Sequence, residues 1–449
     1  MRLPWRPGER TLRAAHPLIH FSDTHIPLRG GASATLRGPG TTPAPFCLWQ
    51  GVQLIAEMRG AFIAAAGTDR GRRLHMGAEE EIFGYADELG PEKVIHFYDP
   101  RLQLKGILVV DNTALGPAIG GIRMAPDVTT REVFRLARSM TLKNSAAGIS
   151  YGGGKAGIRG NPDMTNKDEV IRAFARFLRV HTDYIPGPDM GTDEHCMAII
   201  QDEIGRAIGL HKELGGIPLD EIGVTGYGAV EAAEVAADFI GMSLKDATVA
   251  IEGFGAVGQA CFRSLVTKGA KVVAVSDIDG ALFDPDGLEF DAIVQYDQST
   301  KKVSKLWNRA YDRGRRISDE ELFGLDVDIL VPGARPDVIT MRNVEDVKAR
   351  LVVEAANIPA TLEAERHLGD KGVLVIPDFV ANGGGVIAGS VELRRGTIEE
   401  SFETIRKQIR HNVSEILALS KAEGLYPREA AEQLARRRVI VAMKDKGRL

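Results

Sequence analysis

Three ionisable residues in the middle of the chain have types and spacing that suit proton transfer. Lys155 lies in the glycine-rich stretch SYGGGKAGI, Lys143 precedes it by twelve residues, and Asp189 follows in GPDMGTDE. Glycines let a backbone press close to a ligand, and a lysine that is desolvated beside a second cation loses proton affinity and can act as a base near neutral pH. We expect Lys155 to be the acid–base group, Lys143 the second cation and Asp189 part of a proton relay. The alternative is that both lysines are solvated surface residues.

A second glycine-rich segment, TVAIEGFGAVGQACF, has the pattern of a dinucleotide-binding turn. An expected strand, TVAI, ends just before the glycines and a helix begins among them, so backbone N–H groups at the helix start can approach a pyrophosphate. A following strand, KVVAVSD, ends in Asp277, 19 residues beyond the last glycine, where an acid can accept hydrogen bonds from the adenine ribose. Asp277 favours NAD over NADP, since a 2′-phosphate would face its charge, although nearby basic residues could still admit NADP. The expected cofactor-binding residues of the turn are Gly253, Gly255, Ala256, Val257 and Gly258.

The elements that must position these residues indicate an α/β protein. Strands expected at residues 248–251, 271–275, 326–331, 351–354 and 373–376 alternate with helices, which is typical of a parallel sheet covered on both faces. Before them we expect a helix at 79–89, a strand at 105–111 and a second helix at 129–147. That second helix should turn Val133, Leu136, Met140 and Lys143 to one side.

Two further helices are expected. Asn166 and Glu169 have the spacing of a capping box at the start of a helix that runs to about residue 182. Near the end of the chain, apolar residues from 398 to 416 recur every three or four positions, which predicts a long amphipathic helix that packs back on the first domain.

Composition excludes several classes of protein. The net charge of -5 gives no basic surface for nucleic acid, and no apolar run is long enough to span a membrane. Three cysteines without a CxxC pair form neither a disulfide framework nor a zinc site, and they fit the reducing cytoplasm. We expect no metal.

The first 75 residues differ from the rest, with ten Arg, no Lys and only four acidic residues. Such a composition can belong to an organelle transit peptide. The interpretation that we favour is a disordered extension, or the product of a start codon assigned too early. The remaining boundaries that we expect are a substrate-binding and catalytic domain at 76–220, a Rossmann domain at 221–385 and C-terminal helices at 386–449 that pack between the two domains.

Eight blocks occur in order along the chain and together resemble the glutamate/leucine/phenylalanine/valine dehydrogenase family. They are GPAIGGIRMAPDVT, MTLKNSAAG, YGGGKAGI, PGPDMGTDE, GVTGYG, GFGAVG, EAANIPAT and PDFVANGGGVI. The resemblance covers residues 76–449. It implies NAD(P)-dependent, reversible oxidative deamination of an L-amino acid to the 2-oxo acid and ammonia, by a homo-oligomer of six or eight copies.

The resemblance also assigns residues to roles. It implies that Lys155 is catalytic, that Asp189 assists proton transfer and that Lys143 binds the substrate α-carboxylate. Gly121 and Met140 would join the substrate site, and Asn382 would lie beside the reacting centre. Thr225 and Asn357 fall where the family contacts the nicotinamide end of the cofactor.

The substrate side chain is expected to contact residues 119 and 389. Glutamate-specific members carry a lysine at the position of Ile119 and a serine at that of Gly389, so a buried γ-carboxylate would here lack partners at a cost of several kcal/mol. An apolar, branched-chain substrate is therefore favoured. The alternatives are a glutamate dehydrogenase, which the PDMGTDE block resembles more closely, and a non-catalytic NAD-binding sensor.

Overall fold

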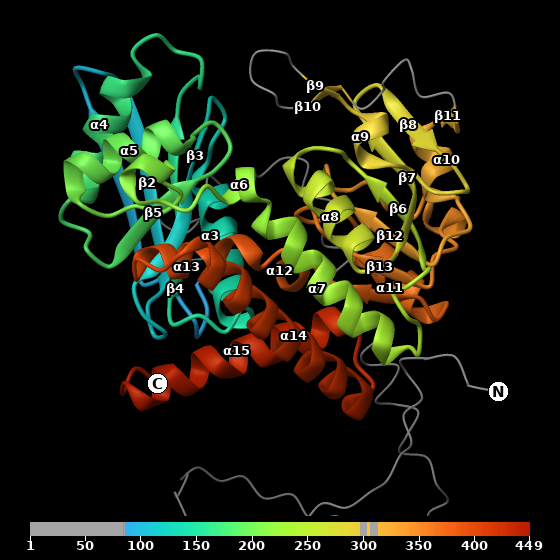
Figure 1. Ribbon diagram of the computed structural model, residues 1–449. Coiled ribbons are helices and arrows are strands. Elements are labelled where there is room, and N and C mark those ends of the chain that lie inside the picture. Colours follow the sequence, from blue (N-terminus) through green and yellow to red (C-terminus); the bar gives the residue numbers. More distant parts are fainter. Residues whose placement is uncertain (1–83, 85, 297–302, 306–312) are drawn as a thin grey trace, which may run out of the picture. The chain divides into compact units, whose positions relative to one another are not determined.

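Two β-sheets organise the part of the chain that the computed structural model describes, which is Gly84 and residues 86–296, 303–305 and 313–449. Both sheets belong to one compact unit, with helices packed against them (Figure 1). The extension at 1–75 and most of the helix expected at 79–89 lie outside the described residues.

The first sheet has the strand order β1-β2-β4-β3-β5. Its first three members pair antiparallel, whereas β3 pairs parallel with both β4 and β5. Alternate residues of β2 point to opposite faces: Ile107 and Val109 pack against helix α3, and Leu108 and Val110 pack in the core that contains α4 and α5. The elements are β1 (Lys93–Asp99), β2 (Leu104–Asn112), β3 (Ala118–Ala125), α3 (Thr130–Ala146), β4 (Gly152–Arg159), α4 (Lys167–Leu178), β5 (Tyr184–Pro188) and α5 (Glu194–Ile204).

The second sheet has seven strands in the order β11-β8-β7-β6-β12-β13-β14. The five strands from β7 to β14 are parallel, and β8 and β11 add an antiparallel edge. Apolar strand residues are buried on both faces of the sheet, and the sequences of these strands therefore consist mostly of Val, Ile, Leu and Ala. The strands are β6 (Thr248–Glu252), β7 (Lys271–Asp277), β8 (Gly280–Phe283), β11 (Arg315–Ile317), β12 (Ile329–Pro332), β13 (Leu351–Val353) and β14 (Leu374–Ile376); a short pair, β9 (Gln295–Tyr296) and β10 (Val303–Lys305), stands apart.

Helices cover both faces of this second sheet. One face packs against α7 and α8, and the other against α10 and α11. The helices are α6 (Leu219–Ile222), α7 (Val224–Phe239), α8 (Ala256–Thr267), α9 (Phe290–Ile293), α10 (Asp319–Phe323), α11 (Leu362–Asp370), α12 (Asp378–Ala381), α13 (Gly384–Leu393), α14 (Ile398–Glu423) and α15 (Pro427–Asp445), with single 3₁₀ turns at Lys212–Leu214 and Val344–Asp346.

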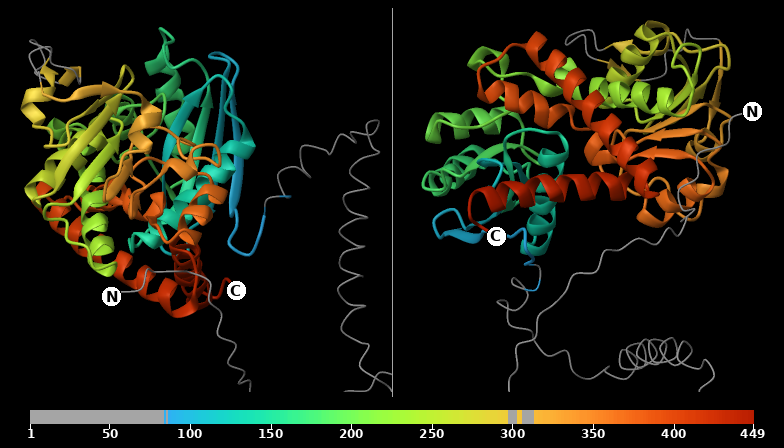
Figure 2. Two further views of the ribbon diagram at one scale, coloured as in Figure 1. Left: turned by 90° about the vertical axis from the view of Figure 1, so that its right-hand side faces the viewer. Right: turned by 90° about the horizontal axis from the view of Figure 1, so that it is seen from below.

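The last two helices connect the sheets. Helix α14 packs along α7, whereas α15 contacts both α3 beside the first sheet and β14 of the second (Figures 1 and 2). The sequence predicted that the amphipathic helix would pack on the first domain. The C-terminal helices do return to the first domain, mainly through α15, which reaches α3, whereas the apolar stripe of α14 (Ile405, Ile409, Val413) joins the core around α7.

Most of the expected elements are confirmed, including all five parallel strands, but two local predictions were wrong. Residues Asp87–Gly90 form a tight turn in place of the end of a helix, because the Asp87 carboxylate accepts the Leu89 N–H. Asn166 precedes α4 without a side-chain cap, since its ψ of 27° is not the extended conformation that a cap requires, and α4 ends at Leu178. In α3 the buried stripe contains Val133, Ala137, Thr141 and Asn144, which leaves Leu136, Met140 and Lys143 half-buried at its border.

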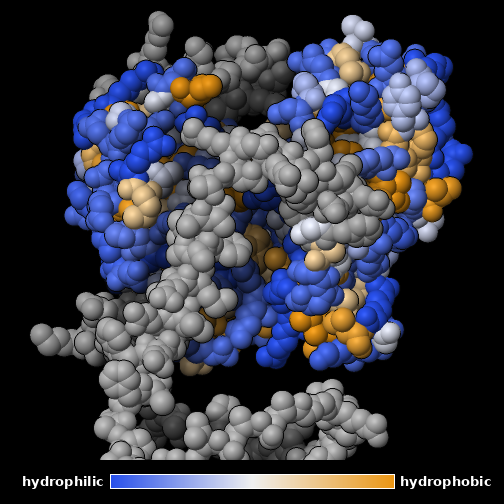
Figure 3. All heavy atoms as spheres, turned by 180° about the vertical axis from the view of Figure 1, so that it is seen from behind, coloured by the Kyte–Doolittle hydropathy of each residue, from blue (hydrophilic) through white to orange (hydrophobic). Residues whose placement is uncertain are grey.

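The visible surface of the described residues in Figure 3 is largely hydrophilic, with apolar side chains in scattered patches. No helix in the described part of the chain is long and apolar enough to cross a membrane.

Candidate active site

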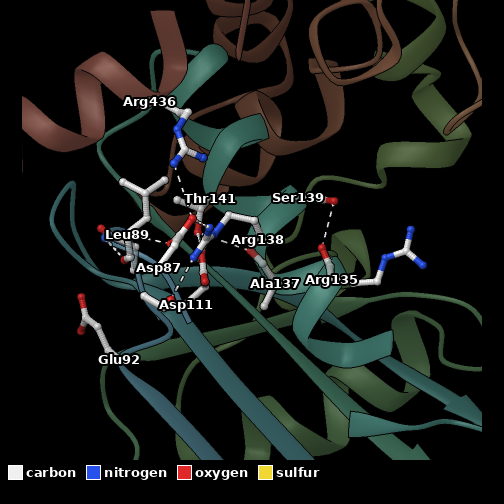
Figure 4. Close-up of polar contacts among 12 residues, drawn as sticks. Asp87, Leu89, Glu92, Asp111, Arg135, Ala137, Arg138, Ser139, Thr141 and Arg436 are labelled. Atoms are coloured by element: carbon white, nitrogen blue, oxygen red, sulfur yellow. Dashed lines mark hydrogen bonds and ion pairs between the residues drawn. The ribbon is translucent and has the colours of Figure 1, made fainter. Parts of the chain in front are cut away.

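Helix α3 is fixed on the first sheet by a buried ion cluster (Figure 4). The fully buried Asp111, near the end of β2, accepts hydrogen bonds from Arg138 Nε at 2.8 Å and from the Thr141 hydroxyl at 2.6 Å. Arg138 also donates to Asp87 at 2.6 Å. Because these contacts hold the helix at its centre, the next turn has a defined position, and that turn carries Lys143.

Glycines allow strand β4 to approach its neighbours more closely than other residues could. A Cβ on Gly153 would lie 2.0 Å from the Thr141 backbone nitrogen, and a Cβ on Gly120 would lie 1.7 Å from the Gly154 carbonyl oxygen. The glycines before Lys155 therefore serve the close packing of α3, β4 and β3, which brings the Lys155 and Lys143 side chains toward the same place.

Lys155 and Asp189 form the centre of the site. The Lys155 ammonium donates to Asp189 Oδ1 at 2.7 Å, and its side chain is only 6% exposed. Arg123 Nε donates to the other oxygen of Asp189 at 2.8 Å. The Nη1 atom of Arg123 donates to Glu132 at 2.7 Å. One carboxylate thus connects two cations in a largely desolvated place.

Burial perturbs all the charged groups of this centre. It lowers the pKa of Lys155, an effect that Asp189 opposes and Arg123 reinforces. It lowers the pKa of Lys143 to about 8, with a further contribution from Lys155 and opposition from Asp378 and Asp189. Burial acts to raise the pKa of Asp189, but Lys155 and Arg123 overcome it and hold the pKa below its ordinary value. The lowered pKa of Lys155 makes its neutral amine easier to form than that of a solvated lysine, beside a carboxylate whose pKa is lowered as well.

Gly121 borders this centre. A Cβ there would lie 2.7 Å from the Asp189 side chain and 3.2 Å from Lys155 Nζ, so a larger residue would displace the acid–base pair. Met140 is half-buried on α3, one turn before Lys143. The structure thus brings Gly121, Lys155 and Asp189 together.

Asn382 lies in the second half of the chain, at the end of α12, a helix that contacts α3. Its amide nitrogen donates to the Ala356 carbonyl and to Asn357 Oδ1, both at 3.0 Å. Its own Oδ1 is buried and has no hydrogen-bond partner among the described residues. A buried acceptor that lacks a donor is costly, so this atom is suited to receive one from a ligand.

Thr225 lies in the first turn of α7 beside the start of α13. A Cβ on Gly385 would meet the Thr225 hydroxyl at 3.4 Å, and a Cβ on Gly384 would lie 2.1 Å from the Val224 carbonyl oxygen. The glycines that follow Asn382 therefore let α13 pack tightly against α7. This packing fixes Thr225 relative to Asn382.

A small apolar cluster lies around Ile119, which is 1% exposed. It contains Ile119, Ile185 and Ile208, with Tyr151 and Leu393 packed against them. A Cβ on Gly389 would lie 2.9 Å from Ile208 Cδ1, so the glycine leaves room for the isoleucine side chain. Positions 119 and 389, which the sequence singled out together for the substrate side chain, thus meet through Ile208.

The GFGAVG segment has the geometry of a dinucleotide-binding turn. Gly253 has a φ of +91°, which favours glycine, and a Cβ on Gly258 would lie 1.9 Å from the Gly253 carbonyl oxygen. A Cβ on Gly255 would meet nothing within 4 Å. Ala256 and Val257 form the first turn of α8, where backbone N–H groups have no partner within the helix.

The end of β7 completes this turn. The Ser276 hydroxyl accepts the Gly253 N–H at 3.1 Å, and Asp277 is the last residue of the strand next to β6. Open space at Gly255, a helix start and an acid at the end of the neighbouring strand fit the pyrophosphate and ribose of a nicotinamide dinucleotide.

The sequence did not single out three residues that the structure places in or beside these sites. Arg123 stands in the GPAIGGIRMAP block, only two residues after Gly121, and Asp378 stands in PDFVAN, so both were within recognised motifs. Ile208 lies in a segment without a motif. Its contact with Gly389 joins residues that are far apart along the chain and has no signal in the sequence.

Two family models match the chain. The model of the "Glu/Leu/Phe/Val dehydrogenase, dimerisation domain" covers residues 91–206, and that of "Glutamate/Leucine/Phenylalanine/Valine dehydrogenase" covers residues 215–447.

Among curated relatives, the glutamate dehydrogenase of Aeropyrum pernix is 39% identical over 362 residues, which are 75% of this chain and 85% of that protein. The NADP-specific glutamate dehydrogenase of Saccharolobus shibatae is 36% identical, over 75% of this chain and 84% of that one. The NAD-specific glutamate dehydrogenase of Staphylococcus aureus is 37% identical with the same shares.

Solved structures give the same fold. The hetero-hexameric glutamate dehydrogenase from Thermus thermophilus in its Leu-bound form has a TM-score of 0.69 and 28% identity, over 82% of this chain and 94% of that one. The L-tryptophan dehydrogenase from Nostoc punctiforme has a TM-score of 0.64 and 26% identity, over 79% and 97%. The chain belongs to the glutamate/leucine/phenylalanine/valine dehydrogenase family and is an amino-acid dehydrogenase that uses NAD or NADP.

Proposed function

We propose that the protein catalyses the reversible oxidative deamination of an L-amino acid to its 2-oxo acid and ammonia, with Lys155 and Asp189 as the proton-transfer pair. The observation that carries the proposal is the buried Lys155 ammonium, 2.7 Å from Asp189 Oδ1 and close enough to Lys143 for each charge to disfavour the other. Two cations in a desolvated place suit a carboxylate-bearing substrate.

Each of the three ionisable residues has its own role in the proposed reaction. Lys143 binds the α-carboxylate and orients Cα, and a bound nicotinamide would supply the acceptor for the hydride that leaves this carbon. Lys155 in its neutral form removes a proton from the substrate ammonium and releases it through Asp189 to solvent. Neutral again, Lys155 takes a proton from the water that adds to the iminium carbon and returns it to the amino group of the carbinolamine. Asp189 holds Lys155 in place and exchanges protons with it as the C–N bond of the carbinolamine breaks and ammonia leaves.

The dinucleotide would lie across the turn at Gly253–Gly258. Gly255 and the first turn of α8 would hold the pyrophosphate, and Asp277 the adenine ribose, which favours NAD. Thr225, Asn357 and Asn382 would contact the nicotinamide end and the reacting centre.

The substrate side chain is the finer part of the proposal. The cluster of Ile119, Ile208 and Gly389 offers no charged partner, which supports an apolar, branched-chain amino acid. Glutamate is the second candidate, and the names of the relatives favour it, since those at 36–39% identity are glutamate dehydrogenases. The tryptophan dehydrogenase among the similar structures is a relative with an apolar substrate.

We also propose a cytoplasmic homo-oligomer. The matched dimerisation-domain model and the hetero-hexameric assembly of the similar Thermus enzyme support an assembly of several copies.

A screen of the twenty amino acids with NAD and with NADP, followed by nicotinamide absorbance, tests these proposals. We expect leucine or valine to have a higher kcat/KM than glutamate. A glutamate preference of about tenfold or more, which is about 1.4 kcal/mol, would establish the second candidate. The absence of turnover with every amino acid, in a protein that still binds NADH, would refute the enzymatic proposal and leave the sensor.

A further inference from the structure

A buried ionic cluster lies where the last helix meets the second sheet. Arg428, in the first turn of α15, donates through Nε to Glu365 at 2.8 and 2.7 Å. Its Nη2 donates to Glu354 at 3.0 Å and to Asp378 at 2.9 Å. The Arg428 side chain is 15% exposed, and the three carboxylates are 0–9% exposed.

Three acids around one guanidinium leave an excess of negative charge unless a proton is retained. Burial raises the pKa of Glu354 well above its ordinary value, and the neighbouring Glu365 raises it further. Burial also raises the pKa of Glu365. Glu354 Oε1 has no hydrogen-bond partner in the part of the chain that the structure describes. Burial therefore favours the neutral form of the two glutamates, and Asp378 is the third carboxylate that Arg428 binds.

Asp378 links this cluster to the active site. Its Oδ2 accepts the Ile358 N–H at 2.9 Å, directly after Asn357, and its own backbone N–H donates to Glu354 at 2.9 Å. It begins the helix that ends at Asn382. Both oxygens of Asp378 are thus engaged away from Lys143.

Asp378 is nevertheless a neighbour of Lys143. Helix α12 contacts α3, and among the carboxylates Asp378 acts most strongly on the Lys143 ammonium. The two described residues do not form an ion pair, whereas Arg428 and Asp378 do. A rotation of the Asp378 side chain toward Lys143 would give the lysine an internal partner in place of a substrate.

We propose that Arg428 is a positioning residue that holds the Asp378 carboxylate on the 356–358 loop and thereby keeps Lys143 available for the substrate carboxylate. This inference rests on the proposed function for the role of Lys143. Without the guanidinium, Asp378 keeps the Ile358 N–H but loses the donor to its Oδ1, and Lys143, on the helix that α12 contacts, is a cation that can satisfy it.

Kinetics of Arg428→Met test the proposal, with Arg437→Met, an exposed arginine of the same helix, as the matched control. We expect the KM for the amino acid to rise by about tenfold or more while kcat changes less, which is the pattern of lost substrate binding. The double variant Arg428→Met/Asp378→Asn should return KM toward that of the wild type, because an amide still accepts the Ile358 N–H but does not ion-pair with Lys143. A purely structural role would lower Tm without this reversal.

A second measurement does not need turnover. The rate at which trinitrobenzenesulfonate labels Lys143, resolved by mass spectrometry, should fall severalfold in Arg428→Met and recover in the double variant. If Arg428→Met does not fold, Arg428→Lys, which has fewer donors, should change KM and labelling in the same direction.

Folded variants with unchanged KM and labelling would overturn the proposal. A raised KM that the double variant does not reverse would overturn it as well, because Asp378 would then not be the competing group. If the wild-type protein turns over no amino acid, the proposed function fails, while the labelling rates still decide whether Arg428 keeps Lys143 free.

Discussion

Replacement of Lys155 by methionine tests the centre of the proposed mechanism. The substitution keeps most of the side-chain volume and removes the ammonium that lies 2.7 Å from Asp189 Oδ1. Loss of a positioned acid–base group slows a reaction by about 10²–10⁴-fold, which adds about 2.7–5.4 kcal/mol to the barrier. We therefore expect kcat to fall at least about 100-fold.

The structure also says what the substitution should leave intact. Asp189 retains its bond with Arg123 Nε at 2.8 Å, so no buried carboxylate is left without a cation. The expected loss of stability is that of one charged hydrogen bond, about 1.5–3 kcal/mol. Since the glycine turn at Gly253–Gly258 belongs to the other sheet, the Kd for NADH should be unchanged.

The assay is steady-state nicotinamide absorbance with the best amino acid, together with NADH fluorescence titration and thermal unfolding. Lys105→Met, at an exposed position of β2 in the same sheet, is the matched control and should keep normal turnover. Turnover of Lys155→Met within a few-fold of the wild type would refute the assignment. A large loss of NADH binding would show instead that the substitution damages the fold.

Three further substitutions have defined outcomes. Asp189→Asn removes the carboxylate that raises the pKa of Lys155 and leaves burial and Arg123 to lower this pKa, so the neutral base forms at lower pH. The acid limb of the plot of kcat/KM against pH should therefore move to lower pH. A shift to higher pH would contradict this assignment. Ile119→Lys places a cation in the apolar cluster and should raise the ratio of kcat/KM for glutamate to that for leucine by about tenfold or more, measured by competition between the two substrates. Asp277→Ser removes the acid at the end of β7 and should raise the ratio of kcat/KM with NADP to kcat/KM with NAD; an unchanged preference would show that other groups read the ribose.

Elements whose residues form an uninterrupted apolar run or a local motif could be predicted from the sequence. The five parallel strands were found because buried strands read as runs of Val, Ile, Leu and Ala, and the dinucleotide turn was found because its glycines, helix start and terminal Asp277 are close in sequence. Lys155 and Asp189 were paired in advance by motif alone, and the structure brings them into contact.

Contacts between distant segments could not be predicted in this way. Nothing in a single sequence states that β3 lies between β4 and β5, or that Ile208 fills the space left by Gly389. The burial of Thr141 and Asn144 on α3 was also not predicted, because the periodicity of apolar residues does not show that these two residues are buried by polar contacts. Polar residues that are buried because they have partners look exposed until the partners are known.

Helix α15 shows how such distant contacts can serve one site. Near its middle, Arg438 donates to the Ser145 carbonyl at 2.9 Å, and the Ser145 hydroxyl donates to the Ala435 carbonyl at 2.8 Å, which fixes the end of α3 just after Lys143. At its first turn, Arg428 holds Asp378. One helix therefore contacts both the segment that carries Lys143, the proposed substrate-binding cation, and Asp378, the acid proposed to compete for it. Because a helix is stiff over this length, it relates the positions of the two groups, and under the proposal the C-terminal helix would affect substrate binding indirectly, although none of its residues belongs to the proposed site.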